Sequence, residues 1–178
     1  MWALVESGSV SKVFTRPKAI TINDTQYPAN IMSSWTATQL KAIGLYEVII
    51  DNSNYKNPQY YSNTAQEFTF ASNKVTASYG TATALDLDTL KTSRKKTISE
   101  QAYGMLQPND WLVVRNQEAG TAIPSDWTTF RSGVRTAVTD MQAKIDAASD
   151  VDALAALYVY NDADPPVRPL GEFPTPPE

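Results

Sequence analysis

Hydrophobic residues recur at spacings of three and four in the stretch that follows Pro124. The six positions are Trp127, Phe130, Val134, Val138, Met141 and Ile145. At about 100° per residue they fall within an arc of roughly 80°, which is a narrow stripe on one side of a helix. The pattern predicts a long helix over residues 125–147, with Ser125 as its N-cap, that packs against one or two partner elements.

A second helix is predicted over residues 86–106, and Pro108 ends it. Its hydrophobic side carries Leu87, Leu90, Ile98, Ala102 and Met105. A further helix begins at Asn109 or Asp110, and a last short one follows the polar residues 149–152. We expect the helices at 86–106 and 125–147 to lie against each other, because each needs a partner to cover its stripe.

The first 80 residues have the pattern of β-hairpins. Hydrophobic segments flank polar turn sequences at residues 6–9, 23–24 and 71–74. Thr36 and Gln39 form a capping box that begins a short helix, and Gly44 stands at the position of a left-handed C-cap. Residues 45–50 are rich in strand formers and predict a largely buried strand, whereas residues 51–63 predict a surface loop.

These elements predict an α+β protein, and 178 residues are enough to bury a core. We expect a β-hairpin-rich N-terminal region over 1–80, a helical region over 81–160 and a Pro-rich extended tail over 161–178. Six of the eleven prolines lie between Pro165 and Pro177. Such a segment favours extended polyproline geometry over hydrogen-bonded structure.

Composition removes several classes of function. The chain has no cysteine and no histidine, which excludes disulfides and thiolate zinc sites and removes the commonest general base. Its net charge of −4 gives no reason to expect nucleic acid, and no hydrophobic run approaches the roughly 20 residues of a membrane span. We expect no cofactor, no metal and no enzyme; a carbohydrate-cleaving carboxylate pair assembled in space is the remote alternative.

Several charged and aromatic residues have two possible interpretations, a structural role within the fold or a role in binding. The carboxylate pairs at Asp86, Asp150 and Asp162 are interpreted as helix caps or solvated linker rather than cation ligands. The basic run at Lys91 and residues 94–96 is interpreted as a solvated helix face rather than a phosphate contact. For Arg94 we expect the stem along the surface and the head in water, rather than a pair with a carboxylate across an interface. Trp111 and Trp127 could anchor an interface, but we expect both in the protein's own helical core.

Two groups of residues are candidates for contact with a partner. Tyr55, Tyr60 and Tyr61 lie in an Asn-rich loop, and Tyr with Asn combines flat apolar area with adaptable hydrogen bonding. Val167, Leu170 and Phe173 are spaced at threes among prolines, which would align them on one edge of a polyproline helix. Such an edge suits docking into an aromatic-lined groove, on this protein's helices or on a partner.

Several short motifs resemble proteins of tailed bacteriophages. The series Asp110-Trp111, Arg115, residues 123–127, Phe130-Arg131 and Val134-Arg135 resembles the C-terminal helical region of tail fibre assembly proteins. Residues 172–177 are similar to the Pro-rich end of that family, with Phe173 in place of a Trp. Residues 27–31 and 35–48 are similar to segments of small tail proteins of marine and cyanobacterial phages.

The resemblance implies a protein that binds an oligomeric tail fibre or the baseplate. It would act as an assembly chaperone or as a lasting part of the virion, so it would be found in the virion tail and, during assembly, in the host cytoplasm. The alternative is a fibre tip that binds host glycans through the Tyr/Asn loop. Sequence does not separate a chaperone from a structural subunit, because both need a complementary surface.

Overall fold

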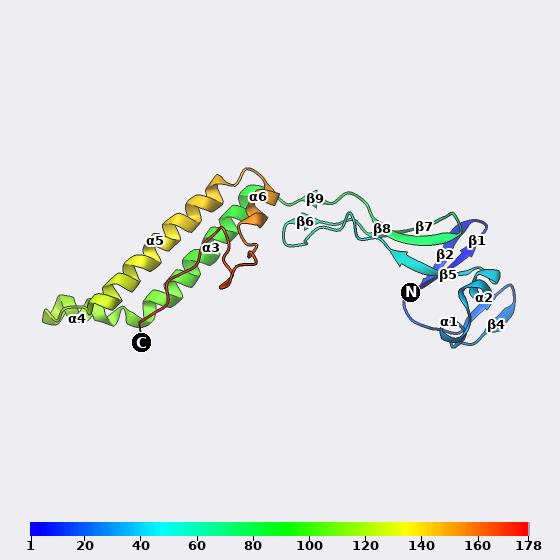
Figure 1. Cartoon of the computed structure of the whole chain (residues 1–178), viewed down its shortest axis with the longest axis horizontal. Coiled ribbons are helices and arrows are strands. Elements are labelled where there is room, and N and C mark those ends of the chain that lie inside the picture. Colours follow the sequence, from blue (N-terminus) through cyan, green and yellow to red (C-terminus); the bar gives the residue numbers. More distant parts are fainter. Residues whose placement is uncertain (178) are drawn as a thin grey trace. The chain divides into compact units, whose positions relative to one another are not determined.

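The computed structural model describes residues 1–177 and divides into two compact units, Met1–Thr83 and Ala84–Glu178. The first unit is built on a mixed five-stranded sheet and the second on helices, so the α+β prediction is confirmed (Figure 1). The division falls close to residue 80, where the sequence changes from strand to helix patterns.

The three predicted hairpins form. They are β1 (Trp2–Glu6) with β2 (Ser9–Phe14), β3 (Ile20–Ile22) with β4 (Thr25–Tyr27), and β7 (Gln66–Ala71) with β8 (Lys74–Tyr79). Each turn contains residues with positive φ, such as Asn23 at 48° and Asp24 at 62°, as tight hairpin turns require. The remaining elements are α1 (Ile31–Ser34), α2 (Ala37–Ala42), β5 (Leu45–Ile50), β6 (Tyr61–Ser62) and β9 (Thr83–Ala84).

The sheet of the first unit has the order β2-β1-β5-β8-β7, with β5 and β8 parallel. Its edge strands β2 and β7 also contact each other, so the sheet is rolled. Alternation along the strands separates two cores: Ala3 and Val75 belong to one face, while Leu4 and Leu45 lie on the other, packed with residues of α1, α2 and β3. The prediction that β5 is largely buried is wrong at the end of the strand. Ile49 and Ile50 belong to neither core and are exposed.

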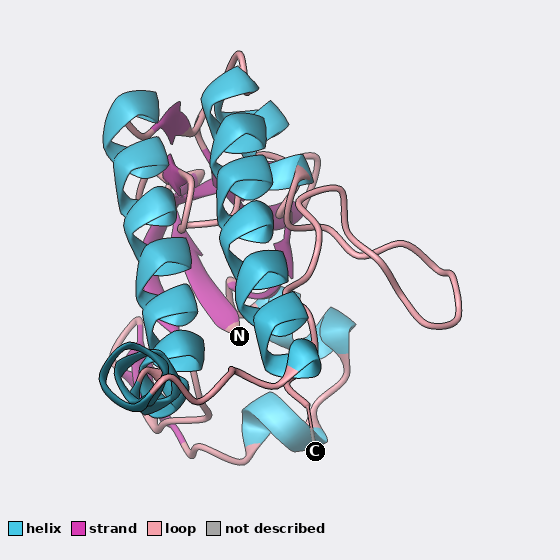
Figure 2. Ribbon diagram, turned by 90° about the vertical axis from the view of Figure 1, so that its left-hand side faces the viewer, coloured by secondary structure: helices cyan, strands magenta, loops and turns pink. Residues whose placement is uncertain are grey.

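The second unit is a helical hairpin with additions at both ends. It comprises α3 (Leu87–Leu106), the 3-10 turn η1 (Gln107–Asn109), α4 (Trp111–Ala119), α5 (Ser125–Ala147) and α6 (Val151–Ala156). The long helices α3 and α5 lie side by side, as predicted (Figure 2). They are antiparallel, since Lys91 near the start of α3 donates to Asp146 O near the end of α5, and Ala102 near the end of α3 packs with Phe130 near the start of α5.

The hydrophobic stripe of α5 faces inward as predicted, with Phe130, Val134, Met141 and Ile145 all buried. The predicted N-cap is wrong. Ser125 is the first helical residue and Pro124, with ψ of 142°, precedes it without a side-chain cap. The ring of Pro124 restricts its own φ, so the backbone is already extended where it enters the helix. Within the helix, the carbonyl of Ser125 accepts a hydrogen bond from the Thr129 hydroxyl at 2.9 Å.

Gly44 joins α2 to β5 at a close backbone contact. Its φ is +81°, its carbonyl accepts a hydrogen bond from Val5 N at 2.8 Å, and a Cβ atom here would lie 2.9 Å from Val5 O. We therefore expect Gly44→Ala to lower the free energy of unfolding of the first unit by more than about 1 kcal/mol in urea denaturation.

Gly8→Ala is the matched control for that substitution. Gly8 has φ +79° in the same unit, but no atom lies within 4 Å of the position that a Cβ atom would take there. Gly8→Ala therefore introduces the backbone strain of a positive φ but no steric clash of the new Cβ atom. Equal losses in the two variants would show that the contact with β1 does not matter.

Candidate functional site

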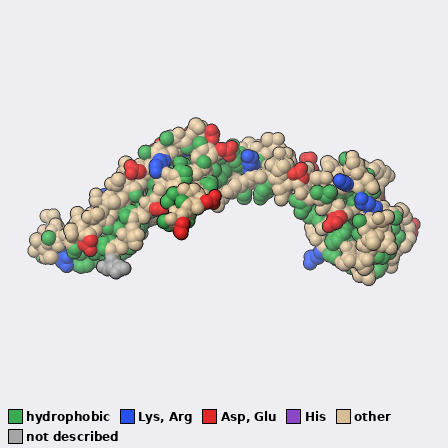
Figure 3. All heavy atoms as spheres, in the orientation of Figure 1, with side chains coloured by type: hydrophobic (Ala, Val, Ile, Leu, Met, Phe, Trp, Pro, Cys, Tyr) green, Lys and Arg blue, Asp and Glu red, His purple; other side chains and the backbone are tan. Residues whose placement is uncertain are grey.

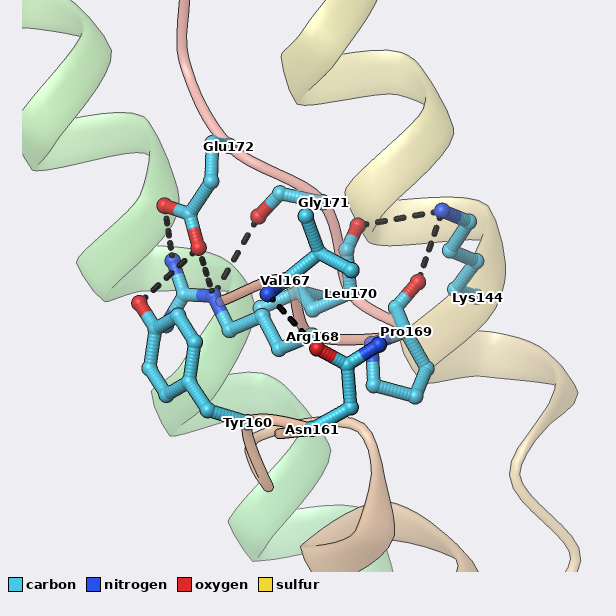
Figure 4. Close-up of polar contacts among 9 residues, drawn as sticks. All are labelled: Lys144, Tyr160, Asn161, Val167, Arg168, Pro169, Leu170, Gly171 and Glu172. Carbon is cyan, nitrogen blue, oxygen red and sulfur yellow. Dashed lines mark hydrogen bonds and ion pairs between the residues drawn. The ribbon is translucent and has the colours of Figure 1, made fainter. Parts of the chain in front are cut away.

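The C-terminal tail, residues 158–177, runs between α3 and α5 of its own chain (Figure 4). Leu170 is only 2% exposed, and its N–H donates to Leu157 O at 3.0 Å. Phe173 packs against the cluster of Ala102, Phe130 and Val134. The structure therefore places two of the three candidate tail residues on this protein's helices, whereas Val167 is 49% exposed.

The tail does not present these residues on one polyproline edge. Gly171 N donates to Arg168 O at 3.0 Å, and Gly171 has φ +97°, which closes a turn in the middle of the segment. That turn separates the environment of Val167 from the buried one of Leu170. Spacing at threes could not reveal the turn, because the prediction assumed one repeating backbone conformation.

Polar contacts fasten this tail, and we call them the tail latch: Lys144, Tyr160, Asn161, Arg168 and Glu172 (Figure 4). The Lys144 ammonium donates to the carbonyls of Pro169 at 2.8 Å and Leu170 at 3.1 Å. Arg168 and Glu172 form an ion pair at 2.8 Å.

The aromatic part of the latch is formed by Tyr160. Its hydroxyl donates to Glu172 at 2.9 Å, and this hydrogen bond raises the pKa of Tyr160. The guanidinium of Arg168 lies over the same ring, 5.4 Å from its centroid. The latch therefore joins the two sides of the tail loop to each other as well as to α5.

A second candidate surface lies on α4. Leu112 is its only buried residue, and the prediction for Trp111 is wrong, since that side chain is 56% exposed. Val113 and Val114 are exposed beside it. At the α4 end of the helical unit, hydrophobic side chains are visible at the surface next to basic atoms (Figure 3). Trp127, by contrast, is partly buried against Phe130, as expected.

Arg131 of α5 fixes the turn between α3 and α4, and we call this turn the corner. The Arg131 side chain is buried; it donates to Leu106 O at 3.1 Å and to the side chain of Asn109, and it pairs with Asp110 at 2.7 Å. Asn109 in turn donates to Met105 O at 2.9 Å. The last carbonyls of α3 are thereby satisfied by side chains, as helix ends require.

Sequence reasoning did not assign a role to Arg131, although a signal was present. The residue lies one turn after Trp127, at the edge of the hydrophobic stripe of α5. A cation at the edge of a buried stripe needs a partner. Its partners Asn109 and Asp110 are more than 20 residues away in sequence, so periodicity alone could not name them.

Arg115 is the charged residue of the α4 surface. Its guanidinium carbon lies 4.8 Å from the centroid of the Trp111 ring, one helical turn away. Its Nε is buried and has no hydrogen-bond partner among residues 1–177. The surface thus combines an exposed indole with a guanidinium that has a free donor.

The Tyr/Asn loop does not form one exposed aromatic tip. Tyr60 is only 5% exposed, which corrects its assignment to a partner contact. Tyr55 is exposed but lies against Tyr79, with 5.0 Å between ring centroids, and Tyr61 lies under the ammonium of Lys56.

The asparagines of this loop are occupied inside the unit. Asn63 bonds both the N–H and the carbonyl of Lys56 at 2.8 Å, and Asn54 donates to Tyr79 O at 3.0 Å. These side chains therefore shape the loop. The adaptable hydrogen bonding on which the binding hypothesis depended is already used.

The carboxylates Asp86 and Asp150 are helix caps, as interpreted. Asp86 accepts from Thr89 N and Asp150 from Ala153 N, each at 2.8 Å. Hydrogen bonds to Thr89 lower the pKa of Asp86, and hydrogen bonds led by that from Ala153 N lower the pKa of Asp150.

The basic run is a solvated face only at Lys96, whereas Lys91, Arg94 and Lys95 have partners on other elements. Lys91 donates to Asp146 O at 3.0 Å, Lys95 pairs with the Asp146 carboxylate at 2.7 Å, and Lys96 faces Glu100. The Arg94 guanidinium lies 5.0 Å from the ring centroid of Tyr158 instead of pointing into water. The partners of Lys91, Lys95 and Arg94 come from α5 and the segment after α6, so local pattern could not predict them.

No family model, curated protein or solved structure matches this chain. Within residues 1–177, no helix is long and apolar enough to cross a membrane, and no three acidic side chains are grouped as metal ligands.

We expect the tail to contribute to the stability of the helical unit through Leu170. Leu170→Ala should lower the free energy of unfolding by about 2–5 kcal/mol, because it empties a buried site. Val167→Ala, on the exposed part of the same tail, should change it by no more than about 0.5 kcal/mol. Urea denaturation with limited proteolysis of the tail measures both effects; a Leu170 variant as stable as the Val167 variant would show that the tail is not docked.

Proposed function

We propose that this chain is a phage tail protein that binds the tail fibre or the baseplate, as a structural virion component or as a fibre assembly chaperone. Two lines of support meet in the helical unit. The resemblance to tail fibre assembly proteins includes Asp110-Trp111, Arg115 and Phe130-Arg131. Of these residues, Asp110 and Arg131 pair at the start of α4, and Arg115 lies over the ring of Trp111 on α4.

The single observation that carries the proposal is the exposed apolar face of α4. Trp111 and Val114 are exposed on one side of this nine-residue helix, and Val113 is exposed on its other side. Grouped exposed apolar side chains mark surfaces that bind protein, and Trp is enriched among the residues that dominate binding energy. Arg131 holds the start of this helix, so its side chains are positioned before a partner arrives.

The rest of the helical unit favours α4 as the docking element. The tail covers the groove between α3 and α5 and buries Leu170 there. A protruding helix with two valines and a Trp suits a hydrophobic groove or a flat surface on another protein. An elongated oligomeric fibre, or the baseplate to which it attaches, is the partner that the resemblance implies.

Purified fibre and baseplate proteins of the same phage provide the test, with binding to the full chain measured by biolayer interferometry. Trp111→Ala should weaken binding by about 30-fold or more, because truncation at such a position costs about 2 kcal/mol or more. Val114→Asp should also abolish binding. Val159→Asp, at an exposed valine outside α4, is the matched control and should bind like the wild type.

Absence of binding by every fibre and baseplate protein would refute the proposal. Equal losses in the Val114 and Val159 variants would refute the role of α4. Proteomics of purified virions then separates the two roles: a stoichiometric presence identifies a structural subunit, whereas absence from virions with co-purification of unassembled fibre identifies a chaperone.

A further inference from the structure

We propose that the α4 surface recognises a hydrophobic partner segment that carries a carboxylate, with Arg115 as the carboxylate receptor and Trp111 as the adjoining apolar anchor. This inference rests on the proposed function and specifies the chemistry of the fibre or baseplate segment that α4 binds. It depends on three features: the unsatisfied guanidinium, the charges around it and its stack on the indole.

The guanidinium of Arg115 lacks any acceptor in the described part of the chain. Its Nε is the one buried side-chain nitrogen or oxygen there without a hydrogen-bond partner. The terminal nitrogens also have no hydrogen-bond partner, yet they are not among the buried unsatisfied atoms, so they reach solvent. Native proteins leave few donors unpaired, so the solvent-accessible terminal nitrogens are the ones that an acceptor on a partner can satisfy.

Neighbouring carboxylates do not neutralise Arg115. Asp110 is engaged by Arg131 at 2.7 Å. Glu118 lies one turn from Arg115 on α4, but the ion pairs of residues 1–177 do not include the two. The positive charge therefore has no ion-pair partner within residues 1–177, on a side of α4 that it shares with Trp111, Val114 and Glu118.

The stack on Trp111 prepares both groups for binding. With 4.8 Å between the guanidinium carbon and the ring centroid, the indole lies against the cation, and the terminal nitrogens remain accessible. A carboxylate that approaches in the guanidinium plane can accept two parallel N–H bonds. The apolar part of the partner then covers Trp111 and Val114, which excludes water and strengthens the ion pair.

A single carboxylate fits this surface better than a polyanion. The helical unit contains more Asp and Glu than Lys and Arg, so its overall field repels nucleic acid. Arg115 is the one basic side chain of α4, and Trp111 and Val114 beside it are exposed. That arrangement matches an amphipathic segment with one Asp or Glu among its hydrophobic residues.

Three labelled helical peptides test the inference without knowledge of the natural partner. They share one leucine-rich face and differ at a single central position on that face, which is Glu, Gln or Lys. Fluorescence anisotropy with the full chain should show that the Glu peptide binds about tenfold or more tightly than the Gln peptide. Rising salt should reduce this difference, because the pair is partly solvated.

Variants then assign the preference to residues. Arg115→Gln should remove the preference for Glu, Arg115→Glu should favour the Lys peptide, and Trp111→Ala should weaken binding of all three. Arg135→Gln, at an exposed arginine of α5, is the matched control and should retain the preference. Far-UV circular dichroism confirms that each variant keeps its helices.

Equal binding of the Glu and Gln peptides to the wild type, no binding of any peptide, or an unchanged preference in Arg115→Gln would each overturn the inference. Self-association that Arg115→Gln abolishes in sedimentation experiments would identify a second copy as the occupant and also overturn it. Fibre binding through α4 without a Glu preference leaves the proposed function intact. A Glu preference without fibre or baseplate binding contradicts only the proposed function.

Discussion

The buried guanidinium of Arg131 determines the geometry of the helical unit where α3 meets α4. It satisfies the last carbonyl of α3, contacts Asn109 and pairs with Asp110, so a single side chain on α5 fixes the direction in which α4 leaves the hairpin. Burial of a cation is costly unless it is paired and hydrogen-bonded, and here several acceptors offset that cost. The exposed position of Trp111 and the half-buried one of Arg115 follow from this corner.

The helical unit separates its hydrophobic surface into a covered and an uncovered part. The tail latch holds Leu170 and Phe173 over the hairpin, and Lys144 fastens the backbone of the tail through two carbonyls. No comparable segment covers α4 within residues 1–177, where Trp111, Val113 and Val114 are exposed. An uncovered face on a fixed helix loses little conformational entropy when it binds, which is the physical basis for assigning docking to α4.

Features with a local physical cause could be predicted from the sequence. The three hairpins, the capping box at Thr36 and the inward stripe of α5 all follow from periodicity and turn chemistry, and all are present. Features that depend on distant partners could not. Tyr60 is buried, Arg94 lies on Tyr158, and a turn at Gly171 separates Val167 from Leu170. Trp111 is exposed because α4 extends from the end of the hairpin, which sequence pattern does not encode.

Hydrogen exchange of the α4 amides in Arg131→Lys and Arg131→Met tests the central claim most directly. Lysine keeps the charge but lacks the planar fork, and methionine leaves Asn109 without its donor. We predict that the amides of Trp111–Ala119 exchange faster in both variants, whereas those in the middle of α3 and α5 keep their protection and Arg135→Met resembles the wild type. Unchanged protection of α4 in the Arg131 variants would contradict the account.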